Sequence, residues 1–123
     1  YGGFNPEKII RKFDIIPSSV VGFFIKRSSL KKVGYLNLKY KIQADYDLLY
    51  RMIVKHNLKG VHSSGKEVFG DLGNSGFSKN HNFWKVLLNE IAIRNDNGQN
   101  KVVLLYIILG RSLKKFFNIL LGS

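Results

Sequence analysis

The chain has 123 residues, of which 45% are apolar and 13% aromatic, so it is long enough for one domain and can form a packed core. It contains no cysteine, which excludes a disulfide scaffold, a thiolate zinc site and a cysteine nucleophile. The formal net charge is +12, divided as +7 over residues 1–41, +1 over residues 42–100 and +4 over residues 101–123. Basic flanks of this kind suit anionic lipids or phosphorylated substrates, although lysine-rich surfaces also serve solubility alone.

The first third of the chain predicts two short helices and a strand. Asn5-Pro6-Glu7 is typical of a helix start, with an N-cap, a proline in the first turn and an early acid. The run Val20–Ile25 is apolar, β-branched and aromatic, which predicts a buried strand. Residues Ser28–Val33 predict a short helical turn, which Gly34 ends.

Residues 45–56 form the clearest helical pattern, because four apolar side chains repeat at helical spacing: Leu48, Leu49, Met52 and Ile53. Asp45 and Asp47 fall in its first turn, where the helix dipole favours negative charge. Asp47 and Arg51 are four residues apart, which predicts an ion pair on the surface. Two short strands are predicted next, at Val61 and at residues 67–69.

The last third predicts a loop and two helices. Residues 70–78 are rich in glycine and polar side chains, as loops are. Residues 83–94 predict an amphipathic helix with a Glu90–Arg94 pair facing outward and four apolar side chains facing inward: Phe83, Leu87, Leu88 and Ile91. Residues 101–121 predict a basic helix interrupted at Gly110, whose longest apolar run is eight residues, far below the roughly 20 needed to span a membrane.

Together these elements predict an α/β fold in which a short mixed sheet is packed by amphipathic helices, with a peripheral C-terminal helix. We expect residues 1–100 to form the main unit and residues 101–123 a basic amphipathic helix. No secretory signal is visible at the start of the chain. Because the chain begins at Tyr1, we expect it to be a piece of a longer protein.

The cluster Asp45-Tyr46-Asp47 is the main candidate for chemistry. Two carboxylates at a helix start could bind a divalent cation or supply a general base, and they could equally be a dipole cap with an ion pair. A second candidate is a loop whose backbone N–H groups could bind a phosphate or a sugar, or which could simply connect two elements: Gly73, Asn74, Ser75, Gly76, Phe77 and Ser78. The three histidines have no metal-ligand spacing, so we expect no metal site in the chain: His56, His62 and His81.

The order of these features resembles the acceptor-side half of family 2 inverting glycosyltransferases, which have the GT-A fold. The match begins with a strand ending at Lys26-Arg27, a short helix and the turn Gly34-Tyr35. It continues with Ala44-Asp45-Tyr46-Asp47, the Arg51 that follows, the loop Ser75–Ser78 and a helix carrying Glu90, and so covers roughly residues 17–94. Ala44 stands where many members have Glu, and Ser75 where the loop usually has its first Gly.

The resemblance implies that Asp45 is the general base that deprotonates an acceptor hydroxyl as it attacks the sugar. Asp47 and Arg51 match positions that orient this motif, and the loop Gly73–Ser78 would lie near the donor phosphates or the acceptor. The implied partners are a nucleotide-sugar donor and a glycan or lipid-linked acceptor of cell-envelope polysaccharide. A divalent cation, Mg²⁺ or Mn²⁺, is expected in the full-length enzyme. Its ligands belong to the family's nucleotide-binding half, which the chain lacks, so the chain alone is expected to be inactive.

The expected location is cytoplasmic, with the basic C-terminal helix resting on the inner face of an anionic membrane. Two alternatives stay open. The chain could be a non-catalytic basic module that binds an anionic membrane or nucleic acid, or a remnant domain kept for protein contacts. Nucleic acid is the less expected partner, because aromatic side chains do not alternate with Lys and Arg as they do on stacking surfaces.

Overall fold

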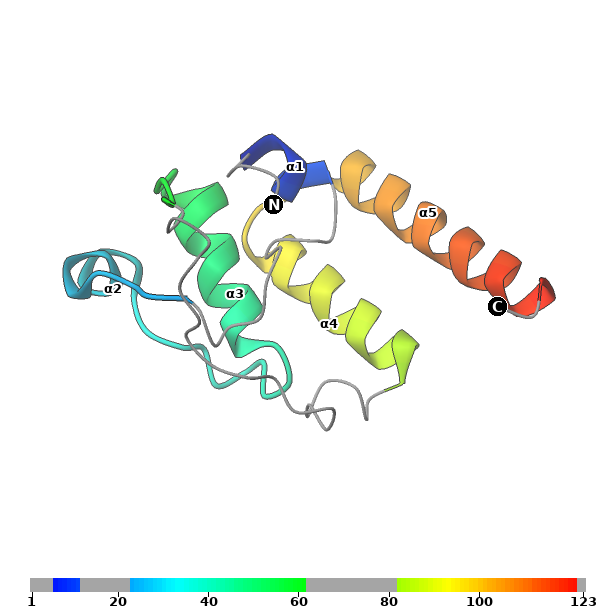
Figure 1. The fold of residues 1–123 in the computed structure, drawn as a ribbon, viewed down its shortest axis with the longest axis horizontal. Helices are drawn as coiled ribbons and strands as arrows, with labels where there is room; N and C mark the ends of the chain where they lie inside the picture. Colours follow the sequence, from blue (N-terminus) through cyan, green and yellow to red (C-terminus); the bar gives the residue numbers. More distant parts are fainter. Residues whose placement is uncertain (1–5, 12–22, 62–81, 122–123) are drawn as a thin grey trace, which may run out of the picture.

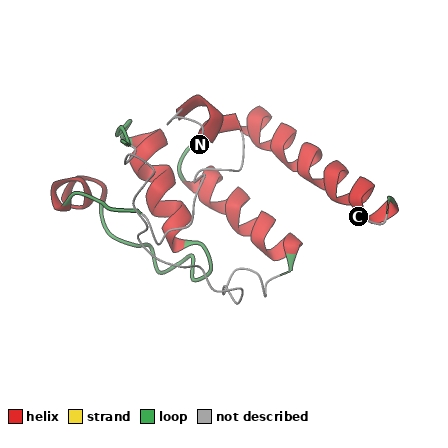
Figure 2. Cartoon of the chain, viewed as in Figure 1, coloured by secondary structure: helices red, strands yellow, loops and turns green. Residues whose placement is uncertain are grey.

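The structure, a computed structural model, describes residues 6–11, 23–61 and 82–121, which form helices joined by loops (Figures 1 and 2). Its elements are α1 (Pro6–Arg11), α2 (Arg27–Val33), α3 (Ala44–Tyr50), the π-helical turn η2 (Arg51–Lys55), α4 (Phe83–Asp96) and α5 (Lys101–Leu120). No strand occurs among these residues, so the predicted short mixed sheet, and with it the α/β class and the GT-A-like domain, is wrong.

The predicted strands show why the prediction failed. Residues 23–26 are irregular, Phe24 is 76% exposed, and Val61 is irregular and 97% exposed. An apolar, β-branched run becomes a strand only when a second segment pairs with its backbone, and none of the described segments does so. The remaining strand predictions, at residues 20–22 and 67–69, lie outside the described residues.

The helix boundaries follow the local signals of the sequence. α1 begins at Pro6 and α2 ends before Gly34, as predicted; Gly34 has φ of +91° and donates its N–H to the Leu30 carbonyl at 2.8 Å. α4 and α5 both begin after an asparagine whose side chain accepts a backbone N–H. Asn82 accepts from Trp84, and Asn100 accepts from Val102.

The core is formed where α3 and η2 pack against α2, α4 and α1, and α3 lies between α2 and α4 in Figure 1. The apolar pattern that predicted this helix is confirmed, since its four residues are all buried. The buried cluster comprises Val33, Tyr40, Tyr46, Leu48, Leu49, Tyr50, Met52, Ile53 and Ile93.

α4 buries a different face from the one that the sequence predicts. Glu90 and Arg94, predicted to face outward, are both buried, whereas Leu88, predicted to face inward, is 65% exposed. Apolar and polar residues are distributed almost evenly around this helix, so the sequence pattern does not indicate which face is buried against the other helices. The buried face of α4 therefore carries charged groups that need partners from other helices.

α5 runs antiparallel to α4 along one side of the molecule (Figure 1). The predicted interruption at Gly110 is wrong, because α5 continues from Lys101 to Leu120 without a break. A glycine lowers helix stability without forbidding the helix. α5 buries only Leu104 and Ile107. No helix among the described residues is long and apolar enough to cross a membrane.

Candidate functional site

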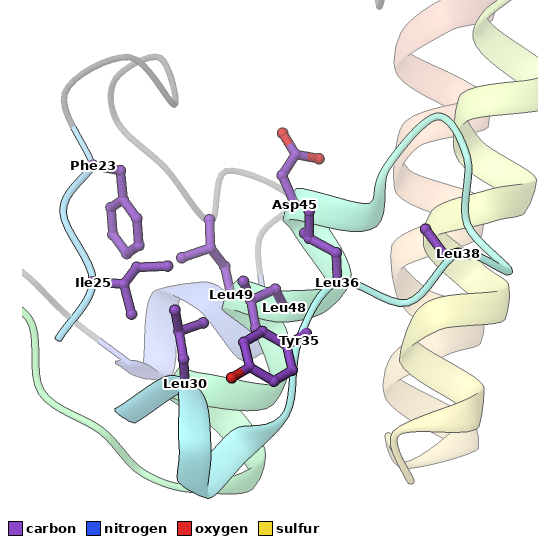
Figure 3. A pocket seen from close by; sticks show the side chains of 9 residues that line it. All are labelled: Phe23, Ile25, Leu30, Tyr35, Leu36, Leu38, Asp45, Leu48 and Leu49. Atoms are coloured by element: carbon purple, nitrogen blue, oxygen red, sulfur yellow. The ribbon is translucent and has the colours of Figure 1, made fainter. Parts of the chain in front are cut away.

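An apolar pocket of about 500 Å³ lies between α2, the following loop and the start of α3 (Figure 3). The irregular segment before α2 forms another of its walls. Among the described residues, aromatic and aliphatic side chains line it, together with the carboxylate of Asp45. The lining residues are Phe23, Ile25, Leu30, Tyr35, Leu36, Leu38, Asp45, Leu48 and Leu49.

Asp45 stands at the rim of this pocket as the second residue of α3. Its carboxylate lies at the edge of the lining side chains and points away from Leu48 and Leu49 (Figure 3). One carboxylate oxygen accepts the backbone N–H of Tyr46 at 2.8 Å. No Lys or Arg of the described residues forms an ion pair with Asp45, so it keeps acceptor capacity for a further group.

Asp47 has a different environment, although it is two residues away. Its carboxylate accepts hydrogen bonds from Arg51 Nε at 2.9 Å and from Asn97 Nδ2 at 3.0 Å. The predicted Asp47–Arg51 ion pair is confirmed, but it is not on the surface, since the two side chains are only 2% and 15% exposed. Asp47 is committed to holding α3 against the end of α4, so it is unsuited to proton transfer.

Arg51 fixes one wall of the pocket. Besides Asp47, its guanidinium donates to the carbonyl of Val33 at 2.7 Å and to the carbonyl of Tyr35 at 2.6 Å. These carbonyls lie at the end of α2 and in the following loop, on either side of Gly34. The side chain therefore ties the segment that carries Tyr35 and Leu36 to the helix that carries Asp45.

The same loop is tied to α4 at its other end. Lys39 and Tyr40 both donate to the Asp96 carboxylate, each at 2.5 Å. The hydrogen bond from Lys39, helped by that from Tyr40, lowers the pKa of Asp96 below its ordinary value of 3.8. Asp96 is thus held as a carboxylate, and the loop is anchored at both ends around the pocket.

Three polar contacts, each with at least one buried partner, also join the helices, and the sequence pattern did not predict them. Gln43 donates to Glu90 at 3.2 Å, and Glu90 also pairs with Arg111 of α5 at 2.6 Å. Arg94 donates to the Tyr46 hydroxyl at 2.9 Å, and burial raises the pKa of Tyr46. The two residues of each pair are 21 to 48 positions apart in the sequence. The one signal that could have indicated these contacts is that Glu90 and Arg94 both lie on the buried face of α4.

The remaining sequence candidates are a loop and three histidines. The loop Gly73–Ser78 lies outside the described residues, as do His62 and His81. His56 is half-buried at the end of η2. In the described part of the chain, no three His, Asp or Glu side chains are grouped so that they could hold a metal ion.

The pocket can therefore offer one rim carboxylate above an apolar and aromatic surface. Comparison of the chain with protein-family models, with curated proteins and with solved structures finds no match.

Proposed function

We propose that the chain is the acceptor-binding part of a sugar transferase, in which Asp45 takes the proton from an acceptor hydroxyl. The observation that carries this proposal is a carboxylate at the rim of an apolar pocket that forms no ion pair with any Lys or Arg of the described residues. The motif resemblance assigns the same residue to the same role. The nucleotide sugar and its Mg²⁺ or Mn²⁺ are assigned by that resemblance to the family's other half.

The chemistry of the step needs a carboxylate with a free lone pair. As the hydroxyl oxygen attacks the anomeric carbon, the C–O bond to the leaving diphosphate breaks and the hydroxyl proton moves to Asp45. A base positioned in this way contributes about 10²- to 10⁴-fold to the rate. Asp47 and Asp96 are already engaged with cations, so they are poorer candidates.

The lining of the pocket favours an acceptor with an apolar face. The aromatic rings of Phe23 and Tyr35 offer surfaces on which the C–H face of a sugar ring or an isoprenoid segment can pack. The leucines complete an apolar wall below Asp45. A hydroxyl carried by such a group would meet the carboxylate at the rim, which supports a glycan or lipid-linked acceptor.

Asp45→Asn in the protein that carries this chain tests the proposal, because it removes the basicity and keeps the shape. Transfer would be followed as nucleoside diphosphate released from a panel of nucleotide sugars in the presence of glycan and lipid-linked acceptors. We expect kcat to fall by about 10²-fold or more. The free energy of unfolding should fall by about 1 kcal/mol or less, because Asp45 forms no ion pair with the described residues and loses only its favourable interaction with the helix dipole.

Two matched variants make the result specific. Asp96→Asn should lower transfer far less than Asp45→Asn does, because it loosens one anchor of the loop and leaves the rim carboxylate in place. Asp47→Asn should lower the free energy of unfolding by about 2 kcal/mol, because a buried ion pair is broken. Full transfer by Asp45→Asn, or an unmodified protein that transfers no sugar from any donor of the panel, would overturn the proposal.

A further inference from the structure

We propose that α5 binds the surface of an anionic lipid bilayer, with its outward apolar face in the acyl layer and its lysines at the headgroups. This proposal concerns a surface on the opposite side of the molecule from α2, and it does not depend on the proposed function (Figure 1).

α5 packs against the other described helices along one side. Leu104 and Ile107 are its buried residues, and Arg111 reaches inward to Glu90 at 2.6 Å. The opposite side is apolar and exposed, and its residues recur three or four positions apart, as one face of a helix requires. We call this the outer face of α5: Val102, Leu105, Tyr106, Leu109, Leu113, Phe116, Phe117 and Leu120, each between 54% and 75% exposed.

The outer face is continuous because the helix is continuous. α5 has 20 residues without a break at Gly110, which gives it a length of about 30 Å. An exposed apolar strip of this length is unusual for a surface that faces only water, and it marks a site that another apolar phase covers.

The charges around this face select a negatively charged partner. Lys101, Lys114 and Lys115 are exposed on α5, and no Asp or Glu occurs after Asp96. Anionic headgroups would neutralise these cations, whereas a second copy of the chain would bring like charges together. A basic helix with one wide apolar face is the form that lies in the plane of a membrane interface.

A groove beside α5 supports the same orientation. It has a volume of about 310 Å³ and lies between the start of α4 and the second half of α5. Trp84, which is 51% exposed, borders it together with Phe116 and Lys115. Tryptophan is enriched at membrane interfaces, and the apolar walls leave room for part of an acyl chain, with Lys115 beside it for the headgroup.

Co-sedimentation with lipid vesicles tests this inference on the full chain. We expect binding to vesicles of phosphatidylcholine mixed with phosphatidylglycerol, and at least about tenfold weaker binding to phosphatidylcholine alone. Phe116→Ser should weaken binding by about tenfold, because it removes apolar area from the acyl layer. Lys114→Ala with Lys115→Ala should weaken binding to the anionic vesicles by roughly fivefold for each lysine.

Matched variants at the other end of the molecule serve as controls. Phe24→Ser and the pair Lys31→Ala with Lys32→Ala make the same chemical changes on exposed residues before and within α2, and should leave vesicle binding unchanged. Equal losses in both sets would mean that binding follows net charge or folding, and would overturn the proposal. So would the absence of vesicle binding, or a dimer in sedimentation velocity that Phe116→Ser dissociates.

Discussion

Arg94 donates a hydrogen bond from Nε to the hydroxyl of Tyr46, 2.9 Å away, and none of Arg94 is exposed to solvent. A second nitrogen of the same guanidinium donates to the carbonyl of Ile10 at 3.0 Å, and the group lies 5.3 Å from the ring centre of Tyr50. One side chain of α4 thus joins α1 and α3 behind the pocket. A buried cation is tolerated here because oxygen atoms and aromatic faces surround it.

Arg94→Ala is expected to lower the free energy of unfolding by about 3 kcal/mol or more. The change leaves the Tyr46 hydroxyl and the Ile10 carbonyl without their donors and opens a cavity in the core. Urea unfolding followed by circular dichroism measures the loss. Tyr46→Phe removes only the acceptor oxygen and should cost about 1 kcal/mol. If the two variants lost equal stability, the Tyr46 hydroxyl alone would account for the contribution of Arg94, and the prediction would be wrong.

Two glycines should respond in opposite directions to the same substitution. Gly34 has φ of +91°, and an added Cβ would lie 3.4 Å from Arg51 Nη1, so Gly34→Ala should destabilise the fold by about 1 to 2 kcal/mol. Gly110 is helical with open space around it, so Gly110→Ala should stabilise α5 by about 0.5 to 1 kcal/mol. Thermal unfolding of the two variants checks both signs, and a stabilised Gly34→Ala would contradict the positive φ of Gly34.

The hydrogen bond between Lys39 and Asp96 should contribute to the loss of folding stability at acidic pH. Because the Lys39 hydrogen bond lowers the pKa of folded Asp96 below 3.8, its contribution is present above that value and is lost as the pH falls through the folded pKa. Urea unfolding at about pH 6 and about pH 3 measures the loss. Asp96→Asn should make the curve shallower over this interval. An unchanged slope would mean that other carboxylates carry the pH dependence.

Local signals in the sequence predicted most helix boundaries and the buried stripe of α3. Gly34 and Pro6 act through their own backbone preferences, and Leu48 and Leu49 through helical spacing, so none of them depends on distant residues. For the same reason the sequence could predict that Asp47 pairs with Arg51. It could not predict that Asp47 is buried in this pair, because its burial depends on Asn97, which follows α4.

The errors share a physical cause. Whether Phe23–Ile25 forms a strand depends on a pairing partner, and whether Glu90 faces inward depends on Gln43 and Arg111, which are far away in the sequence. The placement of Asp45 beside an apolar pocket likewise depends on Tyr35 and Leu36, which Arg51 holds in place. Long-range contacts of this kind leave no periodic trace in the sequence.

The three acceptors around Arg51 also limit which residues can replace it. They lie on a helix, at a helix end and in a loop, in directions that a planar guanidinium meets with three different nitrogens. A single ammonium at the end of a flexible chain carries the same charge but cannot present this fork. We therefore expect relatives to keep arginine at this position. Lysine should be as rare there as a neutral residue, because it preserves the charge but not the three hydrogen bonds.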